Sequence, residues 1–228
     1  KVNFMSYYNC IQVKRWSEYT GVKNFKLHLT MKGKATISVY AIYSASVAVT
    51  YNPLVSQVVE SDEVSEVVVN IPETDKALVG FYMDTLEDTE IYSGYYSADI
   101  EEDRIRDVNI SLVTTTFKKQ EYIKRNIDLI KSNVLYDGSD LKGHMFVHVI
   151  DNDRELDPSE LDSEDLKVYM NNNVGGAGGF TRGMIEALEL PKKPTHVLLM
   201  DDDVMVMPES LFRTYYLLRL LKDEYKKC

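Results

Sequence analysis

The segment Thr195-His-Val-Leu-Leu-Met-Asp-Asp-Asp203 is a short apolar run that ends in three consecutive carboxylates. Its length and flanking prolines predict a buried central β-strand, with the aspartates at the carboxyl end, where open α/β sheets bind ligands. Alternate side chains of an extended segment share one face, so Asp201 and Asp203 are expected to converge on one hard divalent cation. Such an ion would neutralise a diphosphate leaving group. The alternative is an acidic, solvated loop after a strand.

The residues before this segment alternate between strand and helix patterns, which predicts a mostly parallel sheet covered by helices. In chain order the predicted elements are a strand at Val108 to Val113, a helix through Tyr122 and Ile130, strands at Met145 to Ile150 and Lys167 to Met170, a helix with an apolar face at Met184, Ile185, Leu188 and Leu190, and a last helix from Pro208. The chain stops about 120 residues into this domain, and a nucleotide-binding α/β domain commonly needs more. We therefore expect a truncated domain.

The first hundred residues follow a two-residue apolar period instead, which is typical of β-strands. Apolar residues alternate from Phe25 to Met31 and again from Ile37 to Tyr43, which predicts a hairpin that turns near Gly33. Several short strands without a helical period predict an antiparallel β-sandwich. The further strands expected are Val47 to Tyr51, Val64 to Ile71, Ala77 to Met83 and Glu90 to Ser97, with turns at Asn52-Pro53 and Pro72-Glu73.

A cluster of charged residues from Asp99 to Asp107 interrupts the strand pattern. This cluster marks the predicted domain boundary. The sequence thus predicts an all-β domain at residues 1–104 and an α/β domain at residues 105–228.

A glycine-rich turn, Asn171 to Arg182, lies between a predicted strand and a predicted helix. Glycines let the backbone approach a ligand closely, and the amides at a helix N-terminus bind phosphate oxygens, with Arg182 near enough to assist. The segment matches neither a dinucleotide-binding fingerprint nor a P-loop. Tight packing of the helix on the sheet is the alternative role for these glycines.

Two other strand ends carry polar residues that are suited to a nucleotide. One strand runs into Thr114 to Lys119, where hydroxyls, the Phe117 ring and two lysines could hold a base, ribose or phosphate. Another ends at Asp151-Asn152, whose side chains could bind a pyrimidine edge. Parallel strands would place all four polar segments at one sheet edge, although such residues more often serve as caps.

Composition excludes several classes of partner and location. The net charge of −10 and the pI near 4.9 argue against nucleic-acid binding. Only two cysteines are present, which favours a reducing compartment, and no apolar run approaches the ~18 residues of a membrane span. A cytoplasmic protein is expected, with peripheral contact at the inner face of a bacterial membrane left open.

Histidines and aromatic residues give weaker indications. His28, His144, His148 and His196 show no ligand spacing and are expected to have structural roles. Trp16 and the tyrosines of the first half are expected in the core or in cross-strand pairs, with a sugar-binding surface as the alternative.

Four segments together resemble the galactofuranosyltransferase branch of the family 2 glycosyltransferases. They are Thr115 to Phe117, Val149 to Asn152, Asn173 to Gly183 and His196 to Asp203, in that order and spacing. The resemblance extends over nearly the whole chain and implies an N-terminal β-sandwich before a partial GT-A domain, a Rossmann-like nucleotide-diphospho-sugar transferase fold.

This resemblance also implies an activity and roles for individual residues. It implies an inverting transferase that moves galactofuranose from UDP-galactofuranose to a growing cell-surface glycan or lipid-linked glycan. Asp201 and Asp203 would hold Mn²⁺ or Mg²⁺, and Asp202 would lie close to the donor sugar or ribose. The uridine would be bordered by Thr116, Phe117, Lys119, Asp151 and Asn152, and the ribose and diphosphate by Asn173, Gly175, Gly176 and Arg182.

The family's catalytic base, a further metal-binding histidine and its acceptor-binding aromatic residues follow the Asp-x-Asp segment, beyond residue 228. This fragment is therefore expected to bind donor without catalysing transfer alone. Two alternatives are a family 2 transferase with another donor, such as dTDP-rhamnose, and a non-catalytic glycan-binding protein. A homo-oligomer is compatible with each of these.

Overall fold

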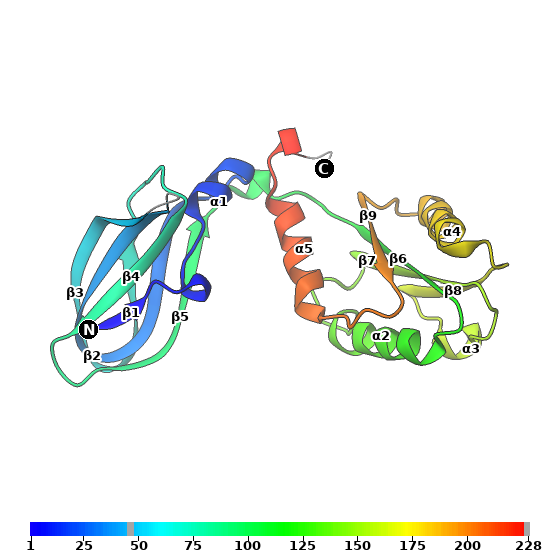
Figure 1. Cartoon of the computed structure of the whole chain (residues 1–228), viewed down its shortest axis with the longest axis horizontal. Helices are drawn as coiled ribbons and strands as arrows, with labels where there is room; N and C mark the ends of the chain where they lie inside the picture. The colour runs from blue at the N-terminus through cyan, green and yellow to red at the C-terminus, as the bar shows by residue number, and fades with distance from the viewer. Residues whose placement is uncertain (45–47, 226–228) are drawn as a thin grey trace. The chain divides into compact units, whose positions relative to one another are not determined.

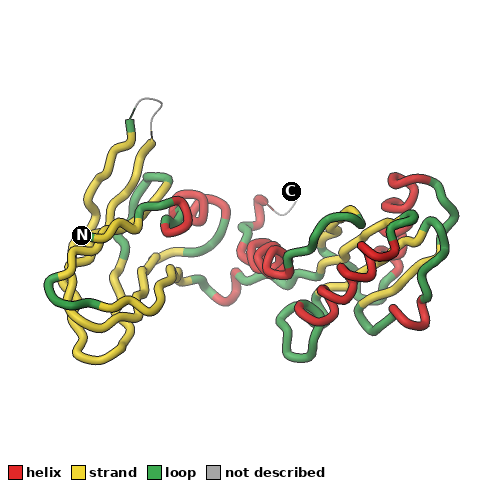
Figure 2. The backbone as a smooth tube through the Cα atoms, turned by 60° about the horizontal axis from the view of Figure 1, so that its bottom comes forward, coloured by secondary structure: helices red, strands yellow, loops and turns green. Residues whose placement is uncertain are grey.

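A computed structural model describes residues 1–44 and 48–225 and divides the chain into two compact units. The first unit comprises Lys1–Ile105 and Leu220–Cys228, and the second comprises Arg106–Arg219. The predicted boundary lay between residues 104 and 105. Val47, at the start of one predicted strand, lies outside the described residues. Residues 1–105 form mostly strands, whereas residues 106–219 alternate strands and helices (Figure 2).

The first unit is built on a five-stranded antiparallel sheet. Its strands are β1 (Val2–Phe4), β2 (Lys23–Ser44), β3 (Val49–Asn70), β4 (Leu78–Thr85) and β5 (Glu90–Asp99). They follow the order β1-β4-β2-β3, and β5 pairs with the first part of β2. The helical segments of this unit are η1 (Tyr7–Asn9), α1 (Val13–Tyr19), η2 (Glu102–Arg104) and η3 (Asp223–Tyr225).

The predicted hairpin at Gly33 is wrong, because β2 continues through this position as one strand. Gly33 has φ of +102°, and the register with β3 shifts between Met31 and Gly33, as in a β-bulge. A β-carbon at Gly33 would lie under 3.0 Å from the backbone of Asp88 and Thr89. The glycine is needed for a bend and a close backbone approach rather than for a chain reversal.

The predicted turn at Asn52-Pro53 is also wrong. Both residues lie inside β3, where Pro53 pairs with Tyr40 at a second shift of register. β3 is an edge strand of the sheet, so Pro53 can lack an N–H group without breaking a ladder on both sides.

Alternation along β2 supplies the core of the first unit. Every second side chain from Phe25 to Met31 and from Ala35 to Ala41 is buried, and partners from β3 and β4 pack with them. The bulge at Gly33 preserves this inward face in both halves of the strand. All five strands belong to one hydrogen-bonded sheet, and the two-sheet sandwich stays a prediction.

The second unit contains a four-stranded parallel sheet in the order β8-β7-β6-β9, with helices on both faces (Figure 1). Its strands are β6 (Ile110–Thr116), β7 (Met145–Asp151), β8 (Leu166–Met170) and β9 (His196–Asp201). Its helices are α2 (Gln120–Asn133), α3 (Pro158–Leu161), α4 (Gly175–Glu189) and α5 (Pro208–Leu220).

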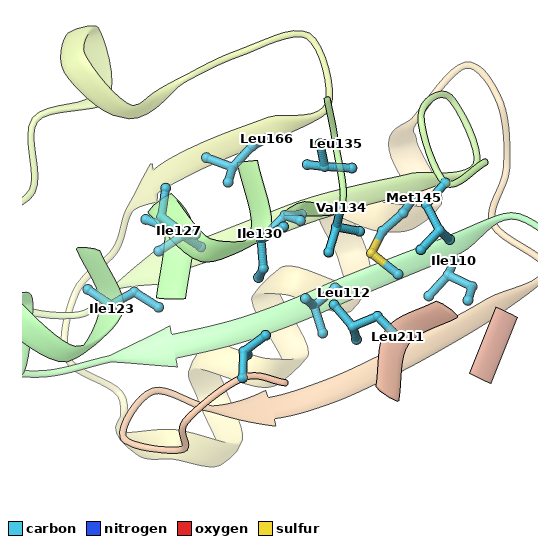
Figure 3. Packing of buried hydrophobic residues seen from close by; sticks show 14 of the residues in the cluster. Ile110, Leu112, Ile123, Ile127, Ile130, Val134, Leu135, Met145, Leu166 and Leu211 are labelled. Carbon is cyan, nitrogen blue, oxygen red and sulfur yellow. The ribbon is translucent and has the colours of Figure 1, made fainter. Parts of the chain in front are cut away.

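One face of this sheet buries the main core of the second unit. Ile123, Ile127 and Ile130 lie at helical spacing on α2 and pack with Leu112 of β6 and Met145 of β7 (Figure 3). Each of these five side chains is at most 2% exposed. Because this face is closely packed, the sheet gives a rigid base to the loops at its edge.

The strand before the three aspartates is not central among the described residues. β9 pairs only with β6 in the described chain, and Val197 and Leu199 are 39% and 48% exposed. The prediction of a buried central strand is therefore wrong for this structure. Leu198 and Met200, on the other face of β9, do pack against the core.

The apolar face predicted for α4 is not the face that contacts the sheet. Ile185 and Leu188 are exposed, whereas Gly179, Gly183 and Ala187 are buried. These three small residues recur every four positions and let the helix lie directly on β6. The GT-A assignment stays a prediction. No helix in the described chain combines the length and apolarity needed to cross a membrane.

Candidate functional site

The carboxyl ends of all four strands of the second unit lie along one edge of the sheet, which we call the polar rim. Parallel register aligns Thr116 of β6 with Asp151 of β7, and Asp151 with Met170 of β8. On the other side of β6, Thr115 lies opposite Asp201 of β9. The predicted gathering of the four polar segments at one edge is therefore confirmed, and their ligands stay predictions.

Asn152 connects three of these segments. Its amide nitrogen donates to Thr115 Oγ1 at 3.1 Å and to the carbonyl of Gly175 at 3.4 Å. Its amide oxygen accepts a hydrogen bond of 2.9 Å from Asn171. The backbone N–H of Asn152 also donates to the Thr116 carbonyl. Asn152 is 5% exposed and thus holds the rim together at the start of α4.

Asp151 is fully buried and supports the loop that follows β7. Its two carboxylate oxygens accept backbone N–H bonds from Asp153 and Leu156, at 3.2 and 2.8 Å. Burial raises the pKa of Asp151, but hydrogen bonds from Asp153 and from the backbone outweigh it and leave this pKa below its usual range. The structure places Asp151 as a loop cap beneath the rim.

Asp153, which the sequence analysis did not select, links the loops after β6 and β7. Its Oδ2 accepts bonds of 2.8 Å from the Lys118 N–H and 2.7 Å from the Gln120 side chain. Burial and the neighbouring Asp151 raise the pKa of Asp153. Lys118 and Arg154 both have positive φ, 57° and 61°. A polar residue two positions after a strand end was the only indication in the sequence.

Phe117 and Thr116 have contrasting environments at the end of β6. The Phe117 ring is 42% exposed, and the Lys118 ammonium lies 5.1 Å from its centroid. Thr116 is buried, and its hydroxyl has no hydrogen-bond partner in the described chain. Of these two predicted nucleotide contacts, only Phe117 offers an accessible surface.

The glycine-rich segment divides into an open part and a packed part. Gly175 has φ of +75°, and its N–H donates to Asn173 Oδ1 at 3.1 Å. A β-carbon at Gly175 or Gly176 would meet no described atom within 4 Å. At Gly179, by contrast, it would collide with Thr115. The first two glycines therefore leave space at the start of α4, and the later one serves helix packing.

The N-terminus of α4 presents free amide groups at the rim. The first turn of any α-helix leaves its N–H groups without intrahelical partners. No side chain in the described part of the chain caps α4 from its N-cap residue, Val174. These amides can accept an anionic oxygen in the space above Gly175 and Gly176.

Arg182 lies two turns into α4 and pairs with Glu186. Its Nε donates to Glu186 Oε1 at 2.6 Å, and one terminal guanidinium nitrogen contacts the same oxygen. Among the described residues, Arg182 has no ion pair with a group of the acidic segment. The role predicted for Arg182 at the diphosphate stays a prediction.

The three aspartates after β9 do not continue the alternation of the strand. β9 ends at Asp201, whose side chain is exposed, and Asp202 and Asp203 lie in a turn. Lys119 Nζ is 2.6 Å from Asp203 Oδ2 and 3.5 Å from Asp202 Oδ1. The hydrogen bond from Lys119 keeps the pKa of Asp203 below its usual range and raises the pKa of Lys119. The pair that shares a cation is thus Asp202 and Asp203.

A metal ion between Asp201 and Asp203 does not fit this arrangement. Carboxylates are suitable ligands for Mn²⁺ and Mg²⁺. However, no group of three or more His, Cys, Asp or Glu side chains among residues 1–44 and 48–225 is arranged to hold a metal. The Lys119 ammonium lies where a cation at Asp203 would bind.

The histidines occupy structural positions, as the sequence analysis expected. His148 is fully buried on β7, bonded to Ser111 at 3.2 Å and stacked with Tyr169. His28 stacks on Tyr95 and contacts Glu66 in the first unit. His144 and His196 contact the Val108 carbonyl and the Thr195 hydroxyl, respectively.

Comparison with known proteins finds two curated relatives and no matching family model. Galactofuranosyltransferase GlfT2 of Mycolicibacterium smegmatis is 23% identical over 235 residues, which cover 98% of this chain. Galactofuranosyltransferase GlfT2 of Mycobacterium tuberculosis is 25% identical over 231 residues, which cover 97% of this chain. The chain spans 35% of the length of each relative. These matches relate the chain distantly to glycosyltransferases.

Solved structures show only slight similarity. A Clostridium thermocellum endo-1,4-β-D-xylanase has a TM-score of 0.26 at 12% identity, over 64% of this chain and 28% of the xylanase. A siderophore-interacting protein from Acinetobacter baumannii has a TM-score of 0.25 at 7% identity, over 77% of each chain. Neither value supports an argument about this fold.

Proposed function

We propose that this chain is the donor-binding part of a galactofuranosyltransferase that uses UDP-galactofuranose and a glycan acceptor. The observation that carries the proposal is the alignment of two galactofuranosyltransferases with 97–98% of the chain. The aligned sequence includes all four segments of the polar rim. Sheet edges of this type commonly bind nucleotides.

Within this proposal, each part of the rim has a task. The exposed Phe117 ring stacks on the uracil base, since an aromatic face accepts a base without requiring a hydrogen-bond pattern. The free amides above Gly175 and Gly176 hold diphosphate oxygens. Asn152 and Asp153 fix the loops that carry these groups.

Inverting transfer requires a base for the acceptor hydroxyl and positive charge for the departing UDP. The α4 amides and Lys119 supply the second requirement. We assign the base to no described residue, and no step of the proposal uses a metal. The acceptor, a cytoplasmic location and peripheral membrane contact belong to the proposal as predictions.

Calorimetric titration of this chain with UDP, without added metal, tests the proposal. UDP should bind, and Phe117→Ala should weaken its affinity about tenfold, because a base stacked on an aromatic ring contributes ~1–3 kcal/mol. Tyr136→Ala is the matched control, since Tyr136 is 49% exposed on the same unit but follows α2, away from the strand ends. Equal weakening by both substitutions, or no UDP binding, would refute the proposal.

A competition experiment then tests the donor. UDP-galactofuranose should displace bound UDP at lower concentration than dTDP-rhamnose does. A preference for dTDP-rhamnose would assign the chain to a different transferase of the same general kind.

A further inference from the structure

Lys119 is the only lysine of the described chain that contacts two residues of the acidic segment. It lies at the N-cap position of α2, in the short loop after β6. Its ammonium is 2.6 Å from Asp203 Oδ2 and 3.5 Å from Asp202 Oδ1. The contact joins residues 84 positions apart in the sequence and thereby ties the loop after β6 to the turn after β9.

The charges at this place balance only in part. Asp201, Asp202 and Asp203 bring three carboxyl groups together in sequence, and one ammonium lies against two of them. Asp202 is nearly buried, with its side chain 11% exposed, whereas Asp203 is half exposed. A second cation at Asp203 would lie within a few ångströms of the ammonium, where like charges repel strongly.

We propose that Lys119 is the resident counter-ion of the acidic segment, and that a divalent cation binds at Asp203 only after the Lys119 ammonium has left it. This inference rests on the proposed function, which places a nucleoside diphosphate at the same rim. It explains why the described arrangement does not fit a metal between Asp201 and Asp203. Lys119 is 41% exposed, so its ammonium can move away without disturbing the core.

Titration of Mn²⁺, with free Mn²⁺ measured by electron paramagnetic resonance, tests the inference on the full chain without nucleotide. Lys119→Met should bind Mn²⁺ about tenfold more tightly than the unchanged protein, because a repelling unit charge is removed. Lys119→Arg keeps the cation and should leave the affinity as it is. Lys118→Met removes the same charge one residue away, where the side chain lies over Phe117, and should change the affinity much less.

Two combined variants identify the carboxylate involved. Asp203→Asn in the Lys119→Met background should abolish the gain in Mn²⁺ affinity. If Asp201→Asn abolishes it and Asp203→Asn does not, the ammonium and the metal do not compete for Asp203, and the inference is overturned. Thermal unfolding of each variant verifies that the second unit is folded.

Chemical modification gives a second readout in the unchanged protein. Mn²⁺ should raise the rate of reductive methylation of Lys119, measured by mass spectrometry, and leave that of Lys118 constant. Equal Mn²⁺ affinity of the unchanged protein and Lys119→Met, or a methylation rate that Mn²⁺ does not alter, overturns the inference whether or not UDP binds. The metal-free UDP titration reports separately on the proposed function.

Discussion

Gly179 of α4 packs so closely on Thr115 of β6 that a β-carbon at Gly179 would lie under 3.0 Å from the threonine side chain. The same threonine hydroxyl accepts the hydrogen bond from Asn152. The distance between helix and sheet at the rim is therefore set by the absence of a side chain at one position.

We expect Gly179→Ala to destabilise the second unit by about 1–3 kcal/mol, because the added methyl group forces α4 away from β6. Gly176→Ala is the control, since its methyl group would meet no described atom within 4 Å. The control should be neutral or slightly stabilising, because alanine favours helix over glycine. Urea unfolding followed by far-ultraviolet circular dichroism measures both. A loss of stability no larger for Gly179→Ala than for Gly176→Ala would contradict the close packing.

Asn152→Leu should loosen the start of α4. The substitution keeps a similar volume but leaves Thr115, Asn171 and the Gly175 carbonyl without this partner, at a cost of about 2–4 kcal/mol. Backbone amides of residues 171–178 should therefore exchange hydrogen faster, as measured by mass spectrometry.

The control for this prediction is Asn172→Leu. Asn172 is exposed, and its side chain has one long contact of 3.4 Å with Arg154. Exchange in residues 171–178 should change little in this variant. If both substitutions accelerate exchange equally, Asn152 does not hold the rim.

The elements that the sequence predicted best are those with a clear period. The apolar residues of α2 recur at helical spacing, and Ile123, Ile127 and Ile130 do form its buried face. The strand β7, predicted from Met145 to Ile150, extends one residue further, to Asp151. Local pattern was sufficient here because burial on one face determines it.

Glycines were the main source of error. At Gly33 the sequence indicated a turn, yet a bulge and a turn both require the same backbone freedom, and only the pairing with β3 distinguishes them. In α4 the apolar residues indicated one face, whereas contact with β6 selected the face with Gly179 and Gly183. Neither outcome depends on residues that are near in sequence.

The acidic segment shows a similar limit at the candidate site. Alternation predicts a shared face for Asp201 and Asp203 only while the backbone stays extended, and β9 ends at Asp201. The partner of Asp203 is Lys119, which lies far away in sequence. Spacing alone could place the carboxylates at the rim but could not identify the cation beside them.

His148 should make the second unit sensitive to acid. Burial, with a smaller effect of Lys167, lowers the pKa of His148 from 6.5 to about 4. The folded state therefore favours the neutral ring, so its contribution to stability is complete above pH 6.5 and is lost as the pH falls towards 4. The loss attributable to this residue is roughly 2–3 kcal/mol over that range.

His148→Gln should remove this part of the pH dependence, which urea unfolding at pH values between 7 and 4 would measure. Ser111→Ala is the matched control, because it removes the hydrogen-bond partner and keeps the imidazole ring. Its stability should still fall with acid as in the unchanged protein. Parallel curves for the unchanged protein and His148→Gln would show that another group causes the sensitivity.

The close approach at Gly33 should make the first unit intolerant of any side chain there. In Gly33→Ala the new β-carbon meets the Asp88 carbonyl and the Thr89 backbone, and two hydrogen bonds to the Lys34 carbonyl, from the Leu86 N–H and the Thr89 hydroxyl, hold this segment in place. We expect a loss of about 3 kcal/mol, from backbone strain together with the collision. Trp16, the only tryptophan, lies in α1 of the same unit and reports its unfolding by fluorescence.

Gly138→Ala separates the two contributions. Gly138 also has positive φ, +93°, but a β-carbon there would meet no described atom within 4 Å. Only the strain of the left-handed backbone remains, so this variant should lose about 1 kcal/mol from the second unit, followed by circular dichroism. The difference between the two losses measures the contact between Gly33 and the segment at Asp88. Equal losses would mean that Gly33 is required for its backbone conformation alone, and that the bend in β2 does not depend on that contact.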